Sequence, residues 1–201
     1  MMETWQRYGL LGYFTLYFFF GFVWRSILVF RQTGINPIVL PATDDAYGYV
    51  GRAFKLAMMA CAGVVLVVTF GERADVWLGG YPALQAPTLR LTGWGLLVLA
   101  LGWMLVAQAQ MGVAWRVGID ARQPTPLVQH GLFSRSRNPI FLSMRVALLG
   151  LVLVAPSAAT LVLLVAGELL MQVQVRLEEQ HLAGLHGERY AAYCKRVRRW
   201  L

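Results

Sequence analysis

Two polar segments near the end of the sequence carry residues that could do chemistry together. The first, residues 130–141, holds Arg137 followed by Asn138 and Pro139. This order is typical of a helix start, with asparagine as the N-cap and proline at the first helical position. A helix N-terminus also binds anions, so with Arg137 beside it the segment could hold a small anionic group such as a carboxylate. The capping and binding interpretations both stay open.

The second polar segment, residues 176–199, begins with the adjacent carboxylates of Glu178 and Glu179. They could pair with arginines, or accept hydrogen bonds from a ribose or an amine. The alternative is an amphipathic helix at a membrane surface. Its lipid-facing side would comprise Leu182, Leu185, Tyr190, Tyr193 and Val197, and its headgroup side Arg189, Lys195, Arg196, Arg198 and Arg199. The two interpretations can hold together.

The composition places the chain among integral membrane proteins. Hydrophobic residues make up 58% of its 201 residues and charged residues 14%, with a mean hydropathy of +0.55. Soluble domains contain about 45–50% apolar and about 25% charged residues. We find no linker or repeat and expect a single domain over residues 1–201. The net charge of +8 suggests anionic lipid headgroups and a defined orientation rather than nucleic-acid binding.

Cysteine and histidine are too scattered to predict a metal site or a disulfide framework. Cys61 lies in an apolar run and Cys194 in the basic tail. The three histidines form no ligand motif. We therefore expect no bound metal.

Apolar runs long enough to cross a bilayer predict an all-α protein with five transmembrane helices. The spans cover residues 10–30, 53–70, 89–111, 140–155 and 158–176, and a cytoplasmic amphipathic helix follows them. Arg25 lies near the end of the first span, where its guanidinium could reach the membrane surface. Gly93, Gly95 and Gly102 of the third span would permit close helix approach.

The last two spans come from one apolar run of about 34 residues, which is too long for a single crossing. Pro156 near its middle would fold the run into a hairpin. Arg145 and Glu168 each lie about eleven residues from this fold. Because charges within a span are costly unless paired, we expect the two to meet across the hairpin. The pair could fix the hairpin's register or take part in catalysis.

The distribution of lysine and arginine predicts the orientation. The first and third loops and the C-terminus share one side and carry about thirteen of the eighteen basic residues. The positive-inside rule then places the N-terminus outside and the C-terminus in the cytoplasm. Both polar segments would face the cytoplasm, where a soluble cosubstrate could reach them.

The polar connection between the third and fourth spans is the longest in the chain. It is too long for a turn and too aromatic for a disordered linker, which is typical of functional segments. The alternative is a surface loop that docks on the bilayer through Trp115 and Phe133. Composition does not decide between the two.

The spacing of these residues resembles the isoprenylcysteine carboxyl methyltransferase family and the related phospholipid methyltransferases. The resemblance rests on Gly131, Phe133, Arg137, Asn138, Pro139 and Phe141, then a hydrophobic hairpin, then Glu178, Glu179, Leu182, Gly187, Tyr190 and Tyr193. It covers about 70 C-terminal residues. Residues 111–120, which precede these positions, are similar to the corresponding segment of bacterial members. This similarity implies a bacterial inner-membrane protein.

The resemblance implies a membrane enzyme that transfers a methyl group from S-adenosylmethionine to a lipophilic acceptor, which enters from the bilayer. The implied cofactor-binding residues are His130, Gly131, Leu132, Asn138, Pro139, Phe141, Glu179 and Tyr190. The implied catalytic residues are Arg137, Glu178 and Glu179. Two positions depart from the family pattern: Asn138 replaces a histidine and cannot titrate, and Phe141 replaces a tyrosine and cannot hydrogen-bond.

Three functions follow as hypotheses. The first is methylation of a carboxylate, which is already ionised at neutral pH and requires no base. The second is N-methylation of a phospholipid headgroup, for which a carboxylate, His130 or His181 could remove the proton. The third is a relative without methyltransferase activity, either a membrane reductase with a nicotinamide cofactor or a structural protein.

Overall fold

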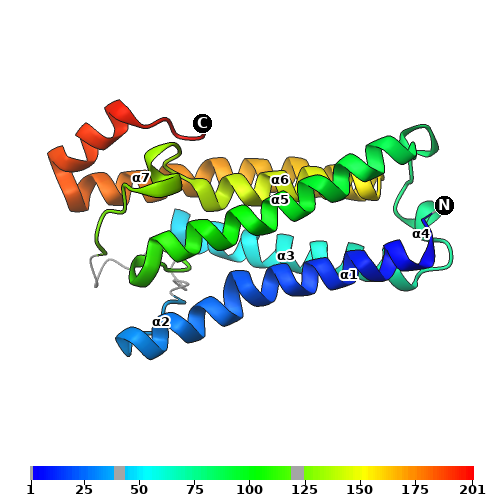
Figure 1. The fold of residues 1–201 in the computed structure, drawn as a ribbon, viewed down its shortest axis with the longest axis horizontal. Coiled ribbons are helices and arrows are strands. Elements are labelled where there is room, and N and C mark those ends of the chain that lie inside the picture. Colours follow the sequence, from blue (N-terminus) through cyan, green and yellow to red (C-terminus); the bar gives the residue numbers. More distant parts are fainter. Residues whose placement is uncertain (1, 39–43, 119–124) are drawn as a thin grey trace.

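The computed structural model describes residues 2–38, 44–118 and 125–201, which form a helical bundle (Figure 1). The first long helix comprises α1 (Thr4–Phe18), the π-helical turn η1 (Phe19–Trp24) and α2 (Arg25–Thr33). The other long helices are α3 (Ala46–Phe70), α5 (Pro87–Met111), α6 (Pro139–Val154) and α7 (Ala158–Arg196). The short elements are α4 (Ala74–Trp77) and the 3₁₀ turns η2 (Pro82–Leu84), η3 (Gly112–Ala114) and η4 (Gly131–Ser134).

Among the described residues, four helices are long and apolar enough to cross a membrane: those of Thr4–Thr33, Ala46–Phe70, Pro87–Ala114 and Ala158–Arg196. The α6 helix is also apolar but has only 16 residues. The predicted all-α membrane fold is confirmed, with a helix over each predicted span. The last span and the amphipathic helix form one element, α7, which bends at Gly187 where φ is +50°.

The long helices run roughly side by side between two ends of the bundle (Figure 1). The N-terminus, α4 and the turn from α6 to α7 lie at one end. The end of α2, η4 and the bend of α7 lie at the other, which we call the site end. The two polar segments of the sequence therefore meet at one end of the molecule, as predicted.

Residues 155–157 turn the chain from α6 into α7, so the predicted hairpin is confirmed. Ser157 caps α7, since its Oγ accepts a hydrogen bond from the Thr160 N–H at 3.2 Å. The Tyr81 N–H donates to the Pro156 carbonyl at 3.0 Å. The loop before α5 thus holds the turn in place.

Arg145 and Glu168 form the predicted ion pair across this hairpin. Arg145 Nε lies 2.6 Å from Glu168 Oε2, and Arg145 Nη2 donates to Oε1 at 2.9 Å. Gln172 also donates to Oε1, at 2.7 Å. The Trp200 ring centre lies 4.2 Å from the guanidinium carbon of Arg145, an attractive cation–π geometry. The pair therefore joins α6, α7 and the C-terminal tail.

Close contact between α5 and α6 depends on two glycines. A Cβ on Gly93 would lie 2.9 Å from the Gly150 carbonyl oxygen, and a Cβ on Gly150 would lie 3.0 Å from the Gly93 carbonyl oxygen. Small residues permit such an approach of two backbones. The same expectation is wrong for Gly95 and Gly102, where an added Cβ would meet no atom within 4 Å.

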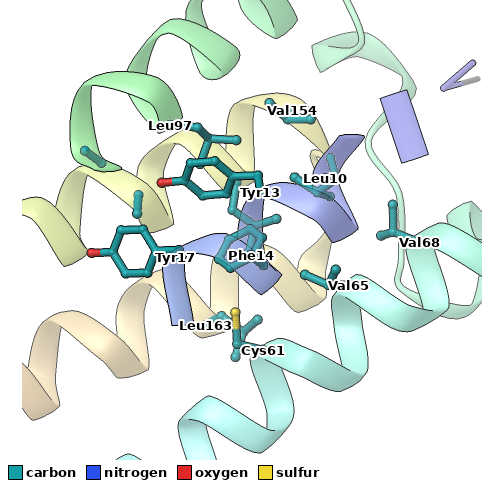
Figure 2. Close-up of a cluster of buried hydrophobic side chains, with 14 of the residues drawn as sticks. Leu10, Tyr13, Phe14, Tyr17, Cys61, Val65, Val68, Leu97, Val154 and Leu163 are labelled. Carbon is teal, nitrogen blue, oxygen red and sulfur yellow. The ribbon is translucent and has the colours of Figure 1, made fainter. Parts of the chain in front are cut away.

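Aromatic residues of α1 form the centre of the core (Figure 2). Tyr13, Phe14 and Tyr17 are buried in one cluster with Leu97 of α5 and other apolar side chains. Tyr17 Oη and Ser143 Oγ of α6 share a hydrogen bond of 3.1 Å. The first helix is thus packed into the bundle that carries the site.

Arg25 has a protein partner near the end of α5. It is buried, and its Nη2 donates to the Gly112 carbonyl just beyond the end of α5. The last carbonyl groups of a helix lack partners within it and carry partial negative charge. The C-terminus of α5 therefore supplies a partner for this guanidinium, and its reach to the membrane surface stays a prediction.

Candidate functional site

The carboxylate of Glu179 is the centre of a charged cluster at the site end. Arg137 donates to its Oε1 from Nε at 3.1 Å and from Nη2 at 3.0 Å. Arg199 donates from Nε to both oxygens at 3.1 Å, and from Nη2 to Oε2 at 2.7 Å. Asn138 Nδ2 lies 3.4 Å from Oε1. The Glu179 cluster, made of these four residues, joins the segment before α6, the α7 helix and the C-terminal tail.

Asn138 belongs to the Glu179 cluster and is also the N-cap residue of α6, since its carbonyl accepts a hydrogen bond from the Leu142 N–H at 3.0 Å. It immediately precedes α6, but its side chain makes no capping hydrogen bond. Its Nδ2 donates to Glu179 and, at 3.2 Å, to the Arg199 carbonyl. Asn138 therefore stands at the predicted N-cap position, while its side-chain amide binds the cluster and not the helix end. Pro139 does begin the helix, as predicted.

Arg137 also fixes the C-terminal tail. Its backbone N–H donates to the Arg198 carbonyl at 3.0 Å. Its Nη1 donates to the carbonyls of Cys194 and Val197 at 3.3 and 3.0 Å, which lie at the end of α7 where helical partners run out. One side chain therefore binds Glu179 and anchors the residues that bring Arg199 to it.

The apolar face of the C-terminal helix contacts protein, not lipid. Tyr190, Tyr193 and Val197 are only 4%, 2% and 7% exposed. Tyr193 Oη donates to the Phe133 carbonyl at 2.6 Å. The bend of α7 returns this helix toward η4 (Figure 1), so the predicted lipid-facing stripe is wrong at these three positions.

The aromatic residues of the long connection are buried as well. Trp115 is 3% exposed and Phe133 is 7% exposed. The interpretation of this connection as a loop that docks on the bilayer through these two residues is therefore wrong. Residues 119–124 of the connection lie outside the described residues.

The 3₁₀ turn η4 rests on Gln110 of α5. The Leu132 N–H donates to Gln110 Oε1 at 2.7 Å. Gly131 has φ +59°, and a Cβ there would lie 2.3 Å from Gln110 Cδ. Backbone conformation and available space therefore both require glycine. His130, which precedes the turn, is exposed.

Glu178 and Glu179 point to different sides of α7 and have different hydrogen-bond partners. Both follow the predicted span at residues 158–176, and successive residues of an α-helix point about 100° apart. Glu178 Oε1 accepts a hydrogen bond from Gln174 at 2.8 Å. Burial raises the pKa of Glu178 to about 7, although the Gln174 hydrogen bond opposes this. Glu178 is thus held partly protonated near neutral pH, on a different side of α7 from the cluster.

The pKa of Glu179 shifts in the opposite direction from that of Glu178. Burial acts to raise its pKa, but the hydrogen bonds and charges of Arg199 and Arg137 outweigh burial and hold the pKa below its usual value. The same contact raises the pKa of Arg199. Glu179 is therefore an anion at neutral pH. Burial, and then the nearby Glu179 charge, raise the pKa of Tyr190, which places this tyrosine beside the cluster.

The structure brings together only part of the predicted site. Arg137, Asn138 and Glu179 are in direct contact, with Tyr190 beside them. Phe141 of α6 lies toward α3 instead, with its ring centre 6.4 Å from that of Phe54. The remaining predicted residues are placed as described above: His130, Gly131 and Leu132 at η4, Pro139 at the start of α6, and Glu178 on another side of α7.

Sequence reasoning missed three contributors to the site. Arg199 was expected to face lipid headgroups, and its role needs a tail that folds back over about twenty residues. Gln110 supports η4, and Trp103 Nε1 donates to the Pro139 carbonyl at 3.1 Å. The polar Gln110 near the end of an apolar span was the one available signal.

In the part of the chain described, no group of three or more metal-binding side chains is found.

Residues 89–189, about half of the chain, match the profile of a family described as phospholipid methyltransferase. This range runs from the beginning of α5 into the bent part of α7 and includes Arg137, Asn138, Glu178 and Glu179. It ends before Arg199. No curated protein matches the chain.

Proposed function

Because this chain belongs to the phospholipid methyltransferase family, a family of membrane methyltransferases, we propose that it transfers a methyl group from S-adenosylmethionine to a lipophilic acceptor. The observation that carries the proposal is the Glu179 cluster. It gathers an anionic carboxylate, two guanidinium groups and an amide from three segments at one end of the bundle. Family membership favours this activity over the reductase and structural alternatives.

The donor set of the cluster fits the cofactor. The methionine end of S-adenosylmethionine carries a carboxylate and an ammonium group, and its ribose carries hydroxyl groups. Arg137 would bind the carboxylate, while Glu179 would accept hydrogen bonds from the ammonium group or the ribose. When bound, the cofactor supplies an electrophilic methyl group on a sulfonium. The protein then contributes mainly proximity and orientation.

Asn138 can fill the place of the usual histidine in this arrangement. Its amide donates to the Glu179 carboxylate, a role that requires no titration. Asn138 therefore positions Glu179 and does not transfer a proton. The substitution is compatible with cofactor binding, and the proton chemistry of the acceptor falls to another residue.

Glu178 favours an amine as the acceptor. An alkylammonium must lose a proton before its nitrogen can attack, and a base works best with a pKa near the working pH. Burial brings the pKa of Glu178 to about 7. The acceptor that this supports best is an amine-bearing membrane lipid. A carboxylate acceptor is the second candidate, favoured by the two arginines of the cluster.

The site end would face the cytoplasm. The loops and tail at this end carry most of the basic residues of the chain. The positive-inside rule assigns such segments to the cytoplasmic side of the membrane, which in our proposal is a bacterial inner membrane. S-adenosylmethionine would then enter from the cytoplasm, and the acceptor would enter from the bilayer.

The test is to incubate membranes that contain the protein with methyl-labelled S-adenosylmethionine and extract the lipids. Base-stable label in the organic phase would identify N-methylation, and base-labile label would identify a methyl ester. The matched control is the Glu179→Gln variant, which should incorporate no label above membranes without the protein. Equal incorporation by the two proteins would contradict the proposal.

A further inference from the structure

A hollow of about 390 Å³ lies at the end of the bundle opposite the site end. Its lining comes from α1, α3, α4, α5 and the turn between α6 and α7, and the N-terminus, α4 and this turn lie together there (Figure 1). Two arginines line it, Arg7 of α1 and Arg90 of α5. Much of the remaining wall is apolar and includes Val68, Leu78 and Val154. The hollow is therefore a separate place from the Glu179 cluster, with its own pair of cations.

Arg90 brings unpaired donors to this hollow. Its Nη1 donates to Gln6 Oε1 of α1 at 3.1 Å. Its Nε is buried and bonds to no acceptor among the described residues. A buried donor without a partner costs free energy, so such groups are generally satisfied by protein, water or a ligand. Arg90 is thus held in place by one nitrogen and has others left for a ligand oxygen.

Arg7 is anchored in a similar way. Its Nη1 donates to the Gly71 carbonyl at 3.2 Å, just beyond the end of α3. Within the part of the chain that the structure describes, neither Arg7 nor Arg90 forms an ion pair. A guanidinium presents its N–H groups as a planar fork that matches the oxygens of a phosphate. The two arginines can therefore bind a phosphate group between them.

The charge of the lining favours a phosphate with a single negative charge. Asp75 of α4 also lines the hollow, and it forms no ion pair with any described residue. Two arginines and one aspartate leave one net positive charge on the lining side chains. A phosphodiester carries one negative charge, whereas a phosphate monoester carries about −1.5 to −2 at neutral pH. The lining thus matches a phosphodiester better than a monoester.

Exposed aromatic side chains indicate the depth of this end in the membrane. Trp5 and Tyr8 of α1, Trp77 of α4 and the following Tyr81 are all exposed there. Tryptophan and tyrosine concentrate at the two membrane–water interfaces, at the level of the lipid headgroups. The phosphodiester found at that level is the one in a phospholipid headgroup, and the apolar helix surfaces below it would contact the acyl chains.

We propose that Arg7 and Arg90 bind the phosphodiester of a phospholipid from the leaflet opposite the site end. The apolar wall at Val68 and Leu78 contacts the glycerol part of the lipid. The bound phosphate joins α1 to α5 and so stabilises the end of the bundle that lies farthest from the Glu179 cluster. This site performs no chemistry, and the inference does not depend on the proposed function.

Thermal unfolding of the full chain in dodecyl maltoside tests the site. A ligand that binds only the folded protein raises the unfolding temperature as its concentration rises. The probes are dioleoylphosphatidylglycerol, dioleoylglycerol, which has the same chains without the phosphodiester, and inorganic phosphate. Phosphatidylglycerol should raise the unfolding temperature to a plateau, and the other two probes should leave it unchanged.

Three arginine variants locate the bound lipid. Arg7→Gln and Arg90→Gln should each raise the apparent Kd for phosphatidylglycerol about tenfold or more, the loss expected when hydrogen bonds to a charged group are removed. Arg73→Gln is the matched control, since Arg73 is exposed beside α4 but does not line the hollow. It should bind the lipid as the unmodified protein does. Native mass spectrometry of the folded fraction counts the retained lipid, so a variant of low stability is still tested.

The contrary outcomes are distinct. Equal affinity in Arg7→Gln, Arg90→Gln and Arg73→Gln would overturn the site and assign the lipid to another basic surface. A rise with inorganic phosphate equal to that with phosphatidylglycerol would show a site for a free anion in place of a lipid. An equal rise with dioleoylglycerol would show that apolar contacts, and not the two arginines, hold the lipid.

Discussion

Arg199 donates hydrogen bonds to both carboxylate oxygens of Glu179, the shortest of them 2.7 Å long. Arg199 lies beyond the end of α7, on a tail that returns to the segment before α6. Its side chain is 34% exposed, while those of Arg137 and Glu179 are 12% and 13% exposed. Arg199 is thus the outer partner of Glu179 and Arg137 is the inner one.

This difference predicts unequal effects on stability. Arg137→Ala should lower the free energy of unfolding by about 2–4 kcal/mol, because it removes an inner partner of a nearly buried carboxylate and frees the end of α7. Arg199→Ala should cost about 1 kcal/mol or less, because exposed ion pairs contribute little. Thermal unfolding in detergent measures both variants. A larger loss from Arg199→Ala would contradict the assignment of inner and outer partners.

The ion pair within the hairpin leads to a second prediction. Arg145→Ala should destabilise the protein by about 1–3 kcal/mol, since it strands the Glu168 carboxylate at membrane depth. The double variant Arg145→Met with Glu168→Leu should recover most of that loss, because no unpaired charge remains. Unfolding temperatures of the single and double variants measure how much of the lost stability is recovered. A double variant no more stable than Arg145→Ala would show that the stranded Glu168 charge does not cause the loss.

The raised pKa of Glu178 predicts how the stability of the protein depends on pH. Its pKa rises from an ordinary value near 4.5 to about 7 in the folded protein, so folding favours the protonated form. The stabilisation is complete below about pH 4.5 and is lost as the pH rises through 7. Glu178→Gln should therefore match the unmodified protein at low pH, and exceed its unfolding free energy by on the order of 2 kcal/mol at pH 8. Parallel stability curves for the two proteins would contradict the shifted pKa.

The conformation of Gly131 in η4 predicts that its substitution destabilises the protein. Gly131→Ala should cost about 1–3 kcal/mol, because φ is positive there and the new Cβ would overlap Gln110. Gly63→Ala is the control, because an added Cβ at that helical position meets no atom within 4 Å. It should leave stability unchanged or raise it slightly. Chemical or thermal unfolding compares the two, and equal effects would show that Gly131 is not required by its conformation.

The sequence was sufficient for the elements and for one tertiary contact. Apolar run lengths predicted the helices, and counting residues from Pro156 predicted the pairing of Arg145 with Glu168. Counting works there because the hairpin is local and its register follows from the position of the turn.

The environment of apolar residues could not be predicted in the same way. An apolar side chain in a membrane protein can face lipid or another helix at similar cost, so periodicity did not reveal that Tyr190 and Tyr193 are buried. The position of Arg199 depends on the bend of α7 and on a tail that docks across the bundle. The different surroundings of Glu178 and Glu179 likewise follow from helix packing, not from their adjacency in sequence.

The central claim is that the Glu179 cluster binds the methyl donor, and calorimetric titration with S-adenosylhomocysteine tests it most directly. The purified unmodified protein should bind with a measurable Kd. Glu179→Gln should weaken binding by about 10- to 100-fold, the loss expected for hydrogen bonds to a charged group, while the exposed Glu188→Gln should bind normally. No binding by the unmodified protein, or equal affinity in all three proteins, would contradict the account.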